Sequence, residues 1–211
     1  MNLSRPLTSL IPSLEGDVLT VLAGAKTSFT GLQVQKIIGK RSVTGVSKTL
    51  QKLCALGIVY SRSAGKANLY ELNREHVLAK YIIEITKVRE EFFRSLSLEV
   101  GSWQLLPECA AVFGSAARSD MTSESDIDVF VARPPEVKFG EPIWRQQLTD
   151  FSLKVQRWTG NSVQIFELGD DEIKRELGSK GGAIYSIIDD GVVIYGSSDY
   201  LRKLRNRVGA K

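Results

Sequence analysis

The most informative part of this chain is a pair of segments, AVFGSAAR at residues 111–118 and SDIDVFV at residues 125–131. Each contains an apolar run of the length and composition typical of a buried β-strand. Asp126 and Asp128 are two positions apart, and side chains at positions i and i+2 of a strand share a face. The pattern therefore predicts a strand, a small-residue turn, and a second strand that presents two carboxylates together.

Two carboxylates on one strand face indicate a cation site. Like charges at this separation are unfavourable unless a cation lies between them, and pairs of hard oxygen ligands suit Mg²⁺ bound together with substrate phosphates. Gly114 allows the backbone to approach a phosphate closely, and the hydroxyl and backbone N–H of Ser115 can contact it. These residue types at this spacing favour phosphoryl or nucleotidyl transfer.

The motif resembles the signature of the DNA polymerase β-like nucleotidyltransferase superfamily: Gly114-Ser115, ten intervening residues, then Asp126-Ile127-Asp128. It is most similar to the minimal nucleotidyltransferase branch, whose motif often continues Gly-Ser-x-Ala-Arg, as residues 114–118 do here. The resemblance covers roughly residues 103–196. It implies that Asp126 and Asp128 are catalytic ligands of Mg²⁺ or Mn²⁺, and that Gly114 and Ser115 bind an NTP.

In this superfamily a third carboxylate on a neighbouring strand completes the site, and in minimal members it follows a Gly-x-x-Val pattern. Matching that pattern to GNSV at residues 160–163 places Gln164 at the third catalytic position. An amide can bind a metal weakly or hydrogen-bond a hydroxyl, but it cannot accept a proton. Glu167 should face away from Gln164 by strand alternation. Surface charge is the favoured interpretation of three other nearby acids: Asp120, Glu124 and Glu167.

Arg118 follows Ser115 closely, where a guanidinium can pair with triphosphate oxygens. The alternative for Arg118 is a surface ion pair with Asp120. The resemblance as a whole implies a transferase that moves a nucleoside monophosphate from an NTP to a hydroxyl acceptor, a protein hydroxyl being one candidate. The alternative function is a DNA-binding transcriptional regulator or antitoxin-like protein whose transferase domain senses nucleotides with impaired catalysis, and Gln164 favours that reading.

Composition indicates a globular protein. Of the 211 residues, 43% are hydrophobic and 25% are charged, values that argue against disorder. No apolar run is long enough to span a membrane, and the first residues lack the apolar core of a signal peptide. Only two cysteines occur, in apolar surroundings, which fits a reducing compartment. We therefore expect a cytoplasmic protein with no membrane partner.

Residues 1–73 form the first predicted domain, with three helices followed by a strand hairpin. Residues 1–75 hold ten Lys/Arg against four Asp/Glu, which gives +6, while the remainder holds 18 against 20, which gives −2. The basic half is where a nucleic-acid partner is expected. The order of elements resembles a winged helix-turn-helix of bacterial transcription regulators, with the third helix as the recognition helix and the hairpin as the wing.

The predicted contacts with double-stranded DNA lie on or just before that third helix and on the hairpin. Such a helix enters the major groove with its N-terminal residues toward base edges, and cations on the wing contact phosphates. The alternative is a protein-interaction module with a solvated basic face. The candidate DNA-binding residues are Arg41, Ser42, Thr44, Ser47, Lys48, Gln51, Lys52, Arg62 and Lys66.

Residues 74–98 are predicted to form one long linking helix capped by Asn73, which is a candidate seam for a homodimer. Residues 99–211 form the predicted nucleotidyltransferase domain with a small mixed sheet. The expected class is therefore α+β: a winged helix domain, a linking helix and a polymerase β-like domain. Expected strands cover 109–113, 127–131, 162–168 and 192–195, and expected helices cover 142–158, 170–177, 183–188 and 202–207.

Overall fold

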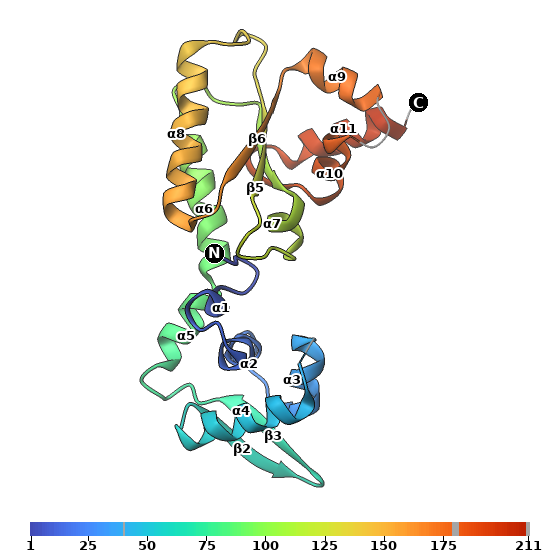
Figure 1. The fold of residues 1–211 in the computed structure, drawn as a ribbon. Coiled ribbons are helices and arrows are strands. Elements are labelled where there is room, and N and C mark those ends of the chain that lie inside the picture. The colour runs from blue at the N-terminus through green and yellow to red at the C-terminus, as the bar shows by residue number, and fades with distance from the viewer. Residues whose placement is uncertain (40, 179–181, 210–211) are drawn as a thin grey trace. The chain divides into compact units, whose positions relative to one another are not determined.

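The computed structural model describes residues 1–39, 41–178 and 182–209, and the chain divides into two units (Figure 1). The N-terminal unit comprises Asn2 and Ser4–Arg89, and the C-terminal unit comprises Met1, Leu3 and the residues from Glu90 onward. Each contains helices and a small sheet, which confirms the predicted mixed α+β class. Among the helices described, none is both long and apolar enough to cross a membrane.

The N-terminal unit packs helices against a three-stranded antiparallel sheet of order β1-β3-β2. Its core includes Leu22, Val34, Val46 and Leu50, none of which is exposed. Its strands are β1 (Phe29–Thr30), β2 (Val59–Ala64) and β3 (Ala67–Leu72). Its helices are α1 (Pro6–Leu10), α2 (Leu14–Ala23), α3 (Gly31–Ile38), α4 (Val43–Ala55) and α5 (Ala79–Thr86). The sequence predicted α2, α3, α4 and the β2–β3 hairpin but missed α1 and β1.

Local side-chain caps explain where α3 and α4 begin. The Thr30 hydroxyl accepts a hydrogen bond from the Gln33 backbone N–H, and the Gln33 side chain accepts one from the Thr30 backbone N–H, which forms a capping box. The Ser42 hydroxyl caps α4 by accepting from the Gly45 N–H at 3.1 Å. Gly39, with φ of 89°, ends α3. Both helix starts follow from residues adjacent in sequence, so they were predictable.

A buried carboxylate ties the turn between α3 and α4 back to α2. Asp17, on α2, is 6% exposed. Its Oδ2 accepts from Nη2 of Arg41 at 3.1 Å, and its Oδ1 accepts from Nη1 of Arg5 at 3.3 Å. Arg5 also donates to the carbonyl of Ile38, the last residue of α3. Arg41, predicted to contact DNA, is therefore engaged within the unit.

The predicted single helix over 74–98 is wrong, because the structure has two helices there. α5 ends at Thr86 and α6 (Val88–Gly101) begins after Lys87. The Thr86 hydroxyl donates to the Ile83 carbonyl at 2.7 Å, and local bonding of this kind competes with continuation of a helix. Asn73 does not cap a long helix either: its Oδ1 accepts from the Glu75 N–H and its Nδ2 donates to the Gly57 carbonyl. Apolar residues continue at helical spacing across Lys87, so the sequence pattern did not indicate that one helix ends there and another begins.

The C-terminal unit has a four-stranded mixed sheet of order β6-β5-β4-β7, in which only β5 and β6 are parallel. The strands are β4 (Cys109–Phe113), β5 (Ile127–Ala132), β6 (Val163–Leu168) and β7 (Val192–Gly196). α6 and α8 (Pro142–Thr159) lie on one side of the sheet in Figure 1. The other side carries α9 (Asp170–Gly178), α10 (Ala183–Asp190) and α11 (Ser198–Gly209).

Strand alternation on β5 separates the two cores of this unit. Val129 and Val131 belong to the cluster that includes Trp144 of α8, whereas Phe130 belongs to the cluster that includes Ile184 of α10. Both faces of the sheet are therefore covered, so the interior strands read as continuous apolar runs. A charged residue within such a strand is exceptional, and β5 contains one, at its N-terminal end.

Two local differences from the expectations bear on the site. The small-residue turn after β4 is a short helix, α7 (Gly114–Arg118), which Ser119 ends in a left-handed conformation with φ of 64°. α10 continues to Asp190, two residues beyond the expected end of this helix at residue 188.

We predict that Asp17→Ala lowers the unfolding free energy of the N-terminal unit by about 2 kcal/mol, because it removes a buried acceptor of charge-assisted hydrogen bonds. Glu15→Ala, on the same helix, removes the more exposed contact with Lys52 and should cost less than about 1 kcal/mol. Hydrogen exchange of the α2 and α4 amides measures both values. Equal costs would contradict the role given to Asp17.

Candidate active site

The Asp128 carboxylate lies directly against the backbone of Gly114. The antiparallel register of β4 and β5 pairs Phe113 with Asp128, and Gly114 follows with φ of +66°. A Cβ added to Gly114 would lie only 2.5 Å from Asp128 Oδ2. Only glycine meets both requirements, the positive φ and the close approach. The two halves of the motif, far apart in sequence, are thus in contact.

Asp126 lies immediately before β5 and is exposed, whereas Asp128 is half-buried. Burial raises the pKa of the Asp128 carboxyl, the nearby Asp126 carboxylate raises this pKa further, and the Arg118 guanidinium opposes the shift. The two carboxylates therefore interact electrostatically, although Asp126 lies outside the strand on which the i, i+2 spacing placed both. Such a pair of oxygen donors could hold a divalent cation.

Gln164 lies beside Asp128, because the parallel register of β5 and β6 pairs these two residues. It is exposed and offers an amide at the position where the resemblance implied a third acid. Within the residues described, no group of three His, Cys, Asp or Glu side chains is arranged to hold a metal ion. The available donors are therefore two carboxylates and one amide oxygen, a hard set that fits Mg²⁺ bound together with phosphates.

Two of the other acids near the motif have cationic partners. Glu167 accepts from Arg133 Nε at 2.5 Å and from the indole N–H of Trp144 on α8 at 3.2 Å. It therefore points to the α8 side of the sheet, away from Gln164, as alternation predicted. Asp120 accepts from Nε of Arg118 at 3.3 Å. Glu167 therefore does not share a strand face with Gln164, and Asp120 is paired with Arg118.

Ser115 and Arg118, the two predicted phosphate contacts on α7, differ in whether their side chains already have partners within the chain. Ser115 lies in the first turn of α7, and within the described chain its hydroxyl makes no hydrogen bond. Arg118 forms the alternative ion pair with Asp120, and its Nη1 also donates to Asp190 Oδ2 at 2.9 Å. Sequence reasoning missed Asp190, because 72 residues separate it from Arg118. Arg118 is therefore held by two carboxylates at the edge of the site.

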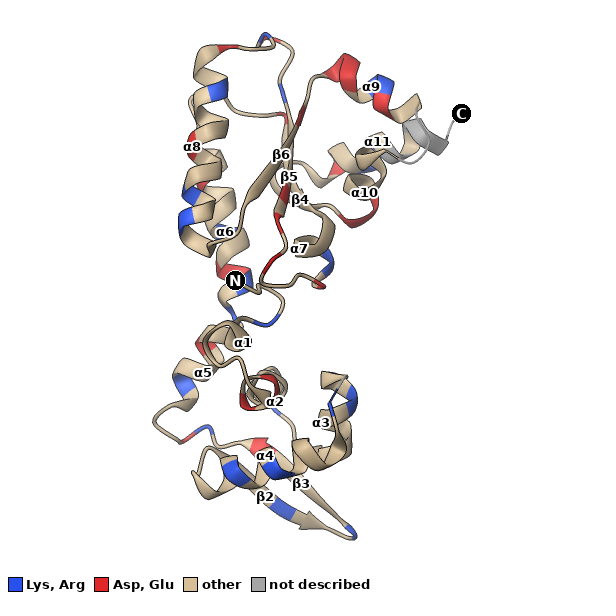
Figure 2. Cartoon of the chain, viewed as in Figure 1, with Lys and Arg blue, Asp and Glu red and all other residues tan. Residues whose placement is uncertain are grey.

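Basic residues of the N-terminal unit occur on α4 and the hairpin (Figure 2), but several predicted DNA contacts have structural partners. Arg41 is bound to Asp17 and Lys52 to Glu15. Ser42 caps α4, Ser47 is half-buried, and Arg62 donates to Ser28 Oγ at 3.4 Å. The predicted residues that remain exposed, with no partner in the described chain, are Thr44, Lys48, Gln51 and Lys66.

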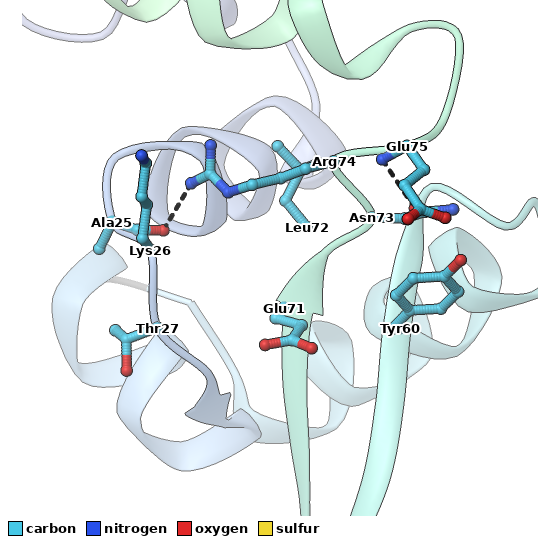
Figure 3. Close-up of a pocket in the computed structure, with 9 residues that line it drawn as sticks. All are labelled: Ala25, Lys26, Thr27, Tyr60, Glu71, Leu72, Asn73, Arg74 and Glu75. Atoms are coloured by element: carbon cyan, nitrogen blue, oxygen red, sulfur yellow. Dashed lines mark hydrogen bonds between the residues drawn. The ribbon is translucent and has the colours of Figure 1, made fainter.

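A separate cavity of about 360 Å³ lies in the N-terminal unit (Figure 3). Figure 3 shows Lys26 and Arg74 at one side, Tyr60 at the other and Glu71 between them. Arg74 donates to the Ala25 carbonyl at 2.9 Å. Cations and carboxylates both line this cavity, and these charged side chains are exposed. The lining therefore gives no preference for a cationic or an anionic ligand.

Comparison with known proteins agrees with the motif in the C-terminal unit. Residues 104–200, slightly less than half of the chain, match the family model described as "Polymerase beta, Nucleotidyltransferase". No curated protein sequence matches the chain significantly.

Three similar solved structures have low sequence identity. A mutant of the MntA–HepT toxin–antitoxin complex gives a TM-score of 0.39 and 8% identity, over 56% of this chain and 84% of that one. A tri-AMPylated HEPN toxin with MNT antitoxin from Shewanella oneidensis gives 0.37 and 10%, over 58% and 84%. TrmBL2, an archaeal chromatin protein with a novel mode of DNA binding, gives 0.31 and 14%, over 88% and 74%. On the family match, residues 104–200 form a nucleotidyltransferase domain of the polymerase beta type.

Proposed function

We propose that the C-terminal unit binds a nucleoside triphosphate with Mg²⁺ and transfers its nucleoside monophosphate to a hydroxyl acceptor. The observation that supports this most directly is the contact between the Asp128 carboxylate and the Gly114 backbone. It brings a metal-binding carboxylate pair next to a glycine–serine turn. A triphosphate bridging these two features would have its phosphates beside Ser115 and its metal-bound oxygens beside Asp126 and Asp128.

Each residue has a defined role in this proposal. Asp126 and Asp128 would hold Mg²⁺ or Mn²⁺, and the bound ion would neutralise the phosphate charge. The Ser115 hydroxyl, which is free of other partners in the described chain, would donate to a phosphate oxygen. The acceptor hydroxyl attacks the α-phosphorus in line with the departing pyrophosphate. Gln164 would hold that hydroxyl by a hydrogen bond. Because an amide cannot accept a proton, the hydroxyl proton would pass to solvent water or to the departing pyrophosphate.

We also propose that the N-terminal unit is a winged helix domain that binds double-stranded DNA through α4. Thr44, Lys48 and Gln51 are exposed at positions i, i+4 and i+7, so they share one face of this helix. Lys66, near the tip of the β2–β3 hairpin, would contact a phosphate. The charge of +6 on residues 1–75 supports a polyanionic partner.

A second candidate function is a DNA-binding regulator whose C-terminal unit senses nucleotides without efficient turnover. Gln164 favours it, because an amide cannot remove a proton from the acceptor. The two functions differ in a measurable way. The enzyme requires turnover that Asp126→Asn abolishes, whereas the sensor requires DNA affinity that changes with nucleotide in the absence of turnover.

We predict that at least one NTP binds the chain only with Mg²⁺, and that Asp126→Asn weakens this binding at least tenfold. The physical reason is the loss of one of two anionic ligands of the cation. Isothermal titration calorimetry with each NTP, with and without Mg²⁺, measures it. Asp171→Asn is the matched control, because its carboxylate side chain is 93% exposed on α9 and should leave binding unchanged. Absence of binding by every NTP would contradict the transferase proposal.

The raised pKa of Asp128 predicts two pH effects. As the pH is lowered, the affinity for Mg²⁺ with an NTP should begin to fall at a higher pH than it would for a site with an ordinary aspartate. The reason is that a carboxyl with a raised pKa takes up a competing proton at that higher pH. The ionised carboxylate also destabilises the folded unit at neutral pH, so Asp128→Asn should raise its melting temperature. That gain should disappear as the pH falls through the raised pKa toward the usual aspartate value. Thermal melts of both proteins across this range check the sign, and a gain that grows in acid would contradict it.

For DNA binding, we predict that Lys48→Ala weakens association with duplex DNA and reduces the slope of log K against log salt concentration by about 0.9. Lys80→Ala removes the same charge from α5 and should leave the slope unchanged. Fluorescence anisotropy at several salt concentrations measures both slopes. Equal losses for the two variants would indicate nonspecific attraction instead of a contact by α4.

A further inference from the structure

Asn161, in the turn between α8 and β6, is a polar residue that is only 3% exposed. Its Nδ2 donates to the backbone carbonyls of Ser125 at 2.9 Å and Ser123 at 3.2 Å. Its Oδ1 accepts from the amino group of Met1 at 2.5 Å. Both hydrogens of this amide are therefore directed at one loop, the loop that leads into Asp126.

The same turn holds the chain on both sides of Asp126. Before it, the Ser125 carbonyl is bound by the Asn161 side chain. After it, the Ile127 N–H donates to the Ser162 carbonyl at 2.9 Å. Two consecutive residues of the α8–β6 turn thus bracket the backbone of Asp126.

The loop itself is short and closed. The Thr122 N–H donates to Ser125 Oγ at 3.0 Å, and the Ser125 N–H donates to the Thr122 carbonyl at 3.4 Å. These bonds fix the shape of residues 122–125 but do not attach them to the sheet. In the described part of the chain, Asn161 is the side chain that donates to the carbonyls of Ser123 and Ser125. Its amide therefore determines where the loop lies relative to β5.

We propose that Asn161 is a positioning residue for the metal site: it sets the direction in which Asp126 is presented beside Asp128. This inference rests on the proposed binding of metal by these two carboxylates. Groups that orient metal ligands without touching the metal contribute substantially to affinity, and their removal commonly costs 10- to 100-fold. Asp126 is exposed and lies outside the strand, so it lacks the packing that orients Asp128.

The neighbouring Thr159 provides a matched control. Its buried hydroxyl donates to the Val155 carbonyl at 2.9 Å and accepts from the Asn161 backbone N–H at 3.2 Å. It therefore stabilises the end of α8 without touching the loop. Thr159→Val and Asn161→Ala both remove buried hydrogen bonds at the same turn, so both should lower the melting temperature. Only Asn161→Ala should affect the metal site.

The experiment is a titration of the full chain with Mn²⁺ alone, followed by the EPR signal of the free ion. We expect Asn161→Ala to weaken Mn²⁺ binding at least tenfold, and Thr159→Val to change it less than twofold. Equal weakening in both variants, or unchanged binding in Asn161→Ala, would overturn the inference. The titration is repeated with each NTP present, and if the unsubstituted chain binds Mn²⁺ neither alone nor with any NTP, the proposed function fails instead.

Two exchange measurements test the positioning role without any metal. In Asn161→Ala, backbone amide exchange should accelerate at residues 123–127 and stay unchanged in β6. In the unsubstituted chain, the Asn161 side-chain amide hydrogens should exchange slowly by NMR, which needs no variant to fold. Rapid exchange of those hydrogens would show that the amide does not hold the loop, and the inference would be abandoned.

Discussion

The contact between the Asp128 carboxylate and the Gly114 backbone is the constraint on which the candidate site depends. It exists only in one register of β4 and β5, the one that pairs Phe113 with Asp128. A slip of one residue would move Asp128 to the opposite face of the sheet. The register is fixed by burial, because Val129 and Phe130 belong to separate cores on the two sides of the same strand. The sheet interior therefore determines the geometry at its polar end.

The second strand pairing sets the chemical character of the site. The parallel register of β5 and β6 places Gln164 beside Asp128, while Glu167 faces α8 and binds Arg133 and Trp144. Because Gln164 is uncharged, the site gathers the two negative charges of Asp126 and Asp128, whereas an acid at position 164 would have added a third. Repulsion in the absence of a cation is correspondingly smaller. An amide also cannot accept a proton, so Gln164 cannot act as a base beside Asp128.

In the N-terminal unit, counting basic residues overestimates the charge available to a partner. Arg5 and Arg41 neutralise the buried Asp17, and Lys52 is bound to Glu15. Arg41 holds the α3–α4 turn to α2, and Lys52 holds α4 itself to Glu15 of α2. Lys48 and Lys66 remain exposed and without a partner in the described chain. Lys48 lies on α4, and Lys66 lies in the turn of the β2–β3 hairpin.

The sequence alone determined features that depend on near neighbours. Apolar runs predicted β4 and β5, and the caps Thr30 and Ser42 set the starts of α3 and α4, because runs and caps involve only a few adjacent residues. The break at Lys87 was missed, since apolar periodicity continues across it and the competing bond of Thr86 is invisible to that pattern.

The tertiary structure decided the features that join distant segments. Arg118 meets Asp190 across 72 residues, and Asn161 reaches the carbonyl of Ser125 across 36. In the sequence, Asn161 only follows Gly160 and precedes the expected strand over residues 162–168. Its role depends on where α8 ends relative to the loop before β5, which is a consequence of packing. A side chain that bonds to a distant backbone carbonyl leaves no trace in the sequence around that carbonyl, because every residue type carries the same group there.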